Sequence, residues 1–92
     1  MKGIILIRQA TVAETELVIE FDVAGFQYLV KNFTDGDIYV GFQTGAGKEE
    51  RILIPVDSAQ IITATPVTGY NIVTIIPTAT SEKGVEVQCL KW

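Results

Sequence analysis

The sequence predicts an all-β chain, a compact antiparallel β-sandwich or jelly-roll-like barrel of about seven or eight short strands. Apolar residues make up 48% of the chain and charged residues only 20%, and the apolar set is rich in Ile and Val. β-branched side chains suit a pleated sheet better than a helix. Short apolar runs also recur at about ten-residue intervals with turn-forming residues between them. Because the chain has only 92 residues, we expect one sandwich domain over residues 1–92.

The first expected strands cover residues 4–8, 16–21 and 26–31. In the second of these, Leu17, Ile19 and Phe21 alternate with Glu16, Val18 and Glu20. Since successive side chains of a strand point to opposite faces, this alternation places Leu17, Ile19 and Phe21 in the core.

An Asp-Gly pair separates residues 26–31 from the next expected strand, residues 38–42. Gly36 can adopt a positive φ at no steric cost, and Asp-Gly favours tight turns. We therefore expect residues 34–37 to form a hairpin turn that pairs these two strands.

The second half of the chain predicts four more strands. A longer, glycine-rich loop at residues 44–48 precedes apolar runs at 51–54, 60–64 and 70–76, each ending near a proline: Pro55, Pro66 and Pro77. The last strand covers residues 85–90, with Val85, Val87 and Cys89 facing inward and Glu86, Gln88 and Lys91 facing solvent.

The residue types present argue against an enzyme. The chain has no histidine and one cysteine, which excludes Ser-His-Asp and Cys-His catalysis and a zinc site of the usual ligands. We interpret Cys89 as a small buried apolar residue. We expect no catalytic residue, no cofactor and no metal, although an enzyme working with carboxylates alone stays an alternative. Asp35 and Asp37 have the D-x-D spacing of calcium ligands, but Asp also favours turns, so both interpretations stay open.

Charge and cysteine content bear on partners and location. The net charge is −4, and the seven Lys and Arg residues are scattered. No basic stripe exists to neutralise phosphates, so we expect neither nucleic acid nor a membrane as partner. The apolar run at residues 4–7 is too short for a signal peptide, and one cysteine allows no internal disulfide. We expect a protein located in a virion, or in the cytoplasm before assembly.

Aromatic residues are the best candidates for a contact face. Tyr39 alternates out of phase with Ile38 and Val40, and Phe33 and Trp92 lie at strand ends. Large aromatic side chains are enriched at protein interfaces. We predict an interaction surface that includes Phe33, Tyr39 and Trp92. It would serve contacts between copies in a homo-oligomer or, as the alternative, binding of a carbohydrate or protein ligand.

Residues 28–40 resemble a pattern of small virion proteins of tailed bacteriophages. In that pattern an aromatic-x-Val-Lys-Asn strand is followed by a polar turn and an Ile-Tyr-Val strand, and looser similarity continues at residues 54–62 and 84–88. The resemblance covers about a third of the chain. It implies a structural component of the head, fibre or tail that assembles as a symmetric homo-oligomer with other virion proteins, and it implies no catalytic or metal-binding residue.

Overall fold

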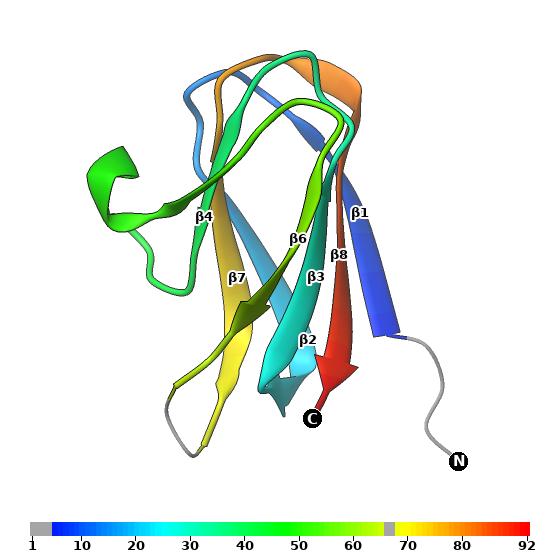
Figure 1. The fold of residues 1–92 in the computed structure, drawn as a ribbon, viewed down its shortest axis with the longest axis vertical. Helices are drawn as coiled ribbons and strands as arrows, with labels where there is room; N and C mark the ends of the chain where they lie inside the picture. Colours follow the sequence, from blue (N-terminus) through cyan, green and yellow to red (C-terminus); the bar gives the residue numbers. More distant parts are fainter. Residues whose placement is uncertain (1–4, 66–67) are drawn as a thin grey trace.

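The computed structural model describes residues 5–65 and 68–92, and these residues form two antiparallel four-stranded sheets (Figure 1). The all-β prediction is confirmed. The first sheet has the order β1 (Ile5–Thr11), β8 (Ser81–Lys91), β3 (Gln27–Asn32) and β6 (Ala59–Thr63). The second sheet has the order β2 (Leu17–Gly25), β7 (Tyr70–Pro77), β4 (Ile38–Gly41) and β5 (Ile52–Ile54). A short 3₁₀ turn, η1 (Lys48–Glu50), lies between β4 and β5.

The strand order is that of a jelly roll. β1 pairs with β8, β2 with β7, β3 with β6 and β4 with β5, as if one long hairpin had been rolled up into two layers. In the described residues the edge strands are β1 and β6 in the first sheet and β2 and β5 in the second. Figure 1 shows the first sheet running from β1 through β8 and β3 to β6.

The core lies between the two sheets and is built from alternate residues of nearly every strand. The expected alternation in β2 is confirmed, because Ile19 and Phe21 are buried while Val18 and Glu20 are exposed. Val85, Val87 and Cys89 are likewise buried in β8. The largest fully buried side chains include Tyr28, Ile38, Ile54, Ile62 and Ile75. β-branched residues dominate this set, which agrees with the composition argument.

The hairpin predicted at residues 34–37 is wrong. β3 and β4 do not pair; they belong to different sheets, and the segment between them crosses from one layer to the other. Gly36 is also not among the glycines with positive φ. A Cβ at this position would lie 2.5 Å from the Thr78 hydroxyl oxygen. A side chain here would have to displace the Thr78 hydroxyl, so close packing, and not a left-handed turn, favours glycine at this position.

Asn32, at the end of β3, connects the two sheets. Its side chain is almost fully buried, and its amide nitrogen donates to the carbonyl oxygen of Gly36 at 2.9 Å and to those of Ile54 and Pro55 at 3.1 Å each. Its side-chain oxygen accepts from the Thr34 backbone N–H at 2.9 Å and from the Thr34 hydroxyl at 2.7 Å. Because Ile54 ends β5 in the second sheet, one side chain holds the crossing segment and both layers together.

The prediction that strands end near prolines agrees with the structure at the two prolines that it describes. Pro55 follows β5 directly, and Pro77 is the last residue of β7. Pro66, the third proline of the pattern, lies outside the described residues. Proline lacks the N–H that a ladder position needs, which is why it stands at strand ends.

Candidate functional site

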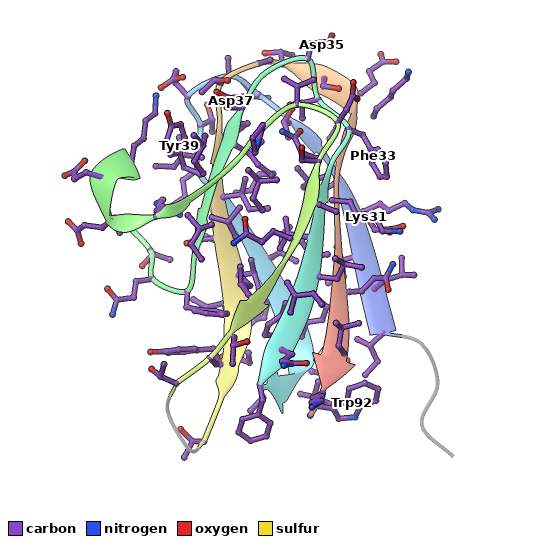
Figure 2. All side chains as sticks on the ribbon, in the orientation of Figure 1. Lys31, Phe33, Asp35, Asp37, Tyr39 and Trp92 are labelled. Atoms are coloured by element: carbon purple, nitrogen blue, oxygen red, sulfur yellow. The ribbon has the colours of Figure 1, made fainter. Side chains whose placement is uncertain are left out.

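The three predicted contact residues lie in different parts of the molecule (Figure 2). Phe33 follows β3 and lies near Asp35 at one end of the sandwich, while Trp92 lies at the opposite end. Tyr39 is in β4 of the second sheet. The structure therefore does not bring Phe33, Tyr39 and Trp92 together into one platform.

Tyr39 points away from the core, as its phase in the strand predicts. Its neighbours Ile38 and Val40 are fully buried, whereas Tyr39 is half-buried on the outer face of the second sheet. The Lys48 ammonium lies 5.4 Å from the centre of the Tyr39 ring and pairs with Glu14 at 2.5 Å. The hydrogen bond to Glu14 raises the pKa of Lys48. The ring is thus partly covered by a cation from the chain itself.

Phe33 and Trp92 differ in exposure. Phe33 is 44% exposed and lines a shallow hollow of about 180 Å³ beside β6, together with residues that include Asp57 and Ser58. Trp92 is half-buried and packs against the core cluster. Of the two, Phe33 has the larger exposed fraction.

A cleft of about 220 Å³ opens between the two sheets beside the edge strands β5 and β6. Its apolar wall includes Phe42 and Tyr70, whose rings stack with centroids 4.7 Å apart, and Ile52 and Ile62 from the two edge strands. Its polar lining includes Gln43, Glu50 and Arg51. Sequence reasoning missed this cleft because its walls come from segments that meet only when the sheets stack, although Tyr70 was recognisable as an aromatic residue at a strand end.

One wall of the cleft is held by Arg51, whose side chain is fully buried. The guanidinium donates to the Thr74 hydroxyl at 2.7 Å, to the Ala46 carbonyl at 3.0 Å and to the Gln43 carbonyl at 3.2 Å, and it pairs with Glu16. A planar guanidinium can bind several acceptors at once in this way. Arg51 therefore anchors the loop between β4 and β5 onto the outer face of the second sheet.

Tyr28 lies beneath the aromatic wall of the cleft, with its ring centre 6.0 Å from that of Phe42, and is fully buried. Its hydroxyl accepts from the Gly25 backbone N–H at 3.1 Å and donates to the Tyr70 carbonyl. Burial, with a further contribution from Cys89, raises the pKa of Tyr28 to about 12. The hydroxyl thus stays protonated at any physiological pH and serves as a structural hydrogen-bonding group.

On the outer face of the first sheet, one row of cross-strand neighbours is apolar in β1, β3 and β6 and polar only in β8. Cross-strand neighbours along this row are Leu6 in β1, Gln88 in β8, Leu29 in β3 and Ile61 in β6. Leu6 is 38% exposed and Ile61 is 52% exposed, and Leu90 on the same face is 38% exposed. Antiparallel sheets often leave one face in water, but that face is usually polar. Exposed apolar side chains aligned on such a face make it a candidate contact surface.

The neighbouring row of the same face is ionic, and here one sequence prediction is wrong. Glu86 was expected to face solvent freely, but it is only 3% exposed because it lies between Arg8 and Lys31 on the adjacent strands. Its carboxylate pairs with Arg8 at 2.7 Å and with Lys31 at 3.1 Å, and it accepts from Gln88 at 3.0 Å. Hydrogen bonds from Gln88, Arg8 and Lys31 lower the pKa of Glu86 to about 2.

Asp35 and Asp37 lie in the segment that crosses between the sheets (Figure 2). Asp35 is exposed, and the backbone carbonyl of Asp37 accepts from the Thr78 N–H at 3.1 Å and from its hydroxyl at 2.7 Å. Over residues 5–65 and 68–92, no cluster of three or more acidic or cysteine side chains is placed to hold a metal ion. These contacts use the backbone of Asp37 and neither carboxylate, so the two interpretations of the D-x-D pattern stay predictions.

Comparison with known proteins finds no match, either to a protein-family model, to a curated protein or to a solved structure. The resemblance to phage virion proteins therefore stays a prediction. No helix in the described parts of the chain is long and apolar enough to cross a membrane.

Proposed function

We propose that this protein is a non-catalytic structural component that works by assembling with further copies of itself. The observation that carries the proposal is the apolar row of Leu6, Leu29 and Ile61 across the outer face of the first sheet. A contact between copies would remove this row from water, at a gain of about 25 cal/mol for each Å² buried. The lack of histidine and the low charge density support the same proposal.

The fold is compatible with a place in a virus particle. Jelly rolls serve as capsid domains, but they also occur in lectins and other proteins, so the fold alone does not select a function. Membership of a phage head, fibre or tail, with other virion proteins as partners, rests on the resemblance of residues 28–40 and is part of the proposal. It would place the protein in a virion, or in the cytoplasm before assembly.

Mass in solution tests the proposal. Sedimentation of the purified chain from about 1 µM to about 1 mM covers the Kd range of weak assembly contacts. We expect reversible association, weakened by Leu6→Lys on the first sheet and unchanged by Leu53→Lys, which alters a leucine of similar exposure on the second sheet (38% against 46%). A chain that stays monomeric throughout, or equal effects of the two variants, would contradict the proposal.

The cleft supports a second candidate, a module that binds a small ring-shaped ligand such as a sugar. The stacked pair Phe42 and Tyr70 offers an aromatic wall, and Gln43 and Glu50 offer polar groups that could orient hydroxyls. Titration with a panel of oligosaccharides, followed by NMR, should then shift signals of the cleft. Tyr70→Ala should abolish those shifts because it removes one ring of the aromatic wall. The variant keeps the hydrogen bond from Tyr28, which uses the backbone carbonyl of Tyr70. Tyr39→Ala should leave the shifts intact. A panel without any response removes this candidate.

A further inference from the structure

The four edge strands are not equally protected against pairing with another chain. β2 carries Glu20 and Asp22, and β1 carries Arg8. Both of these strands also have irregular registers, and β5 is only three residues long and followed by Pro55. Charges, bulges, prolines and shortness are the devices that keep edges apart. Of the four edges in the described chain, β6 has none of them: its five residues are uncharged, and its register with β3 is regular.

The backbone groups that β6 offers to a partner can be assigned from its ladder with β3. At the two ends of that ladder, the Ala64 N–H donates to the Phe26 carbonyl at 2.8 Å and the Asn32 N–H donates to the Ser58 carbonyl at 2.9 Å. In an antiparallel pair, alternate residues bond to the neighbouring strand. The even-numbered residues of β6 therefore face β3, and Ala59, Ile61 and Thr63 direct their N–H and C=O groups outward from the sheet.

We propose that β6 pairs with β6 of a second copy about a two-fold axis, with Ile61 opposite Ile61 of the other copy. This inference rests on the proposed function and names the contact that would serve it. In that register Ile61 exchanges two hydrogen bonds with its equivalent, and Ala59 exchanges two with Thr63 on each side. The same short segment then satisfies the edges of both copies, which is the self-complementarity that a two-fold contact requires.

The side chains favour the same register. Ile61 is 52% exposed and ends the apolar row that begins at Leu6. Pairing at Ile61 brings Leu29 and Ile61 of both copies into one apolar stretch over the four central strands of the joined sheet. No charged side chain of β6 has to enter the joint, because β6 carries none. A strand from an unrelated protein could use the same backbone groups, but it would not extend the row.

Cysteine cross-linking tests the contact and its register. Opposed residues of a hydrogen-bonded antiparallel pair have Cα atoms about 5.5 Å apart, which a disulfide can span. Under mild oxidation, Ile61→Cys should form covalent dimers at least about tenfold faster than Val18→Cys. The two positions are matched, since both are β-branched residues, 52% exposed, on the outer face of an edge strand. A mixture of Ala59→Cys and Thr63→Cys should give the mixed dimer in preference to either symmetric one.

Ile61→Lys, with Val18→Lys as control, should abolish association in the sedimentation experiment because it places like charges face to face. If the wild-type chain associates but Ile61→Cys cross-links no faster than Val18→Cys, this contact is wrong while the assembly proposal stands. If the wild-type chain is monomeric at about 1 mM, both fail. Should Ile61→Lys not fold, as judged by circular dichroism, the mixed Ala59 and Thr63 cross-link decides the question.

Discussion

Replacing Asn32 by Asp keeps the shape of the side chain but removes its two N–H donors and, where the acid ionises, adds a negative charge. In the native protein the Asn32 amide donates to three carbonyl oxygens, those of Gly36, Ile54 and Pro55, at 2.9–3.1 Å. An aspartate keeps the acceptor that serves Thr34 but loses both N–H donors. The three carbonyl oxygens would then face a carboxylate oxygen, which is itself an acceptor and cannot donate to them.

The expected loss of stability follows from those contacts. Each net hydrogen bond contributes about 1 kcal/mol, and each buried group left without a partner costs about 1–3 kcal/mol. For two lost donors we expect Asn32→Asp to lower the free energy of unfolding by about 3–5 kcal/mol at pH 7. That is a large share of the 5–15 kcal/mol typical of a domain, and it corresponds to a fall in Tm of roughly 12–40 °C.

Urea unfolding of wild type, Asn32→Asp and the control Asn71→Asp measures this effect, since Asn71 is exposed on β7. Burial against carbonyl oxygens should raise the pKa of the new carboxyl above its unfolded value. The loss of stability caused by Asn32→Asp therefore grows as the pH rises through the pKa of the carboxyl. It is smaller at about pH 3.5, where the protonated acid can donate one hydrogen bond. A loss below about 1 kcal/mol, or a loss equal to that of Asn71→Asp, would refute the role given to Asn32.

Three further predictions test other parts of the structure. Gly84 has φ +60°, and a Cβ there would lie 1.8 Å from the Gln9 carbonyl oxygen. Gly84→Ala should therefore lower the free energy of unfolding in urea by more than about 3 kcal/mol. The control Gly45→Ala, at φ +76° in open space, should lower it by about 1 kcal/mol. The pKa of Glu86 falls from 4.5 to about 2, so its stabilisation is present above pH 4.5 and is lost as pH falls toward 2. Because Arg8 is largely exposed, water screens this pair, and we expect about 1–2 kcal/mol of acid-dependent stability that Glu86→Gln removes in melts at pH 7 and pH 3. Arg51→Met should cost about 2–4 kcal/mol, measured by thermal unfolding, because the Ala46 carbonyl and the Thr74 hydroxyl lose the donor that Arg51 supplies and Glu16 loses its cation. A loss within 0.5 kcal/mol of zero, as is usual at a surface site, would contradict the anchoring role.

The site could be foreseen only in part. The phase of Tyr39 against Ile38 and Val40 correctly predicted that its ring lies off the core, because direction along a strand is a local property. That Lys48 would cover this ring, and that Phe33 and Trp92 would lie at opposite ends, depended on how the layers stack. The cleft of Phe42 and Tyr70 likewise had no local signature, since its walls come from four strands.

What the sequence by itself determined is the class of structure and the inward-facing residues of its strands. Side-chain alternation and β-branched composition act within a few residues, so Ile19, Phe21 and Val87 could be assigned to the core from their neighbours alone. Only the tertiary structure decided which strands are partners and which charges meet. Asp35-Gly36 suits a crossing segment as well as a hairpin, and Glu86 is covered by Arg8, 78 residues away. Pairing at such separation is selected by how well whole layers pack, a property that no single segment of the chain carries.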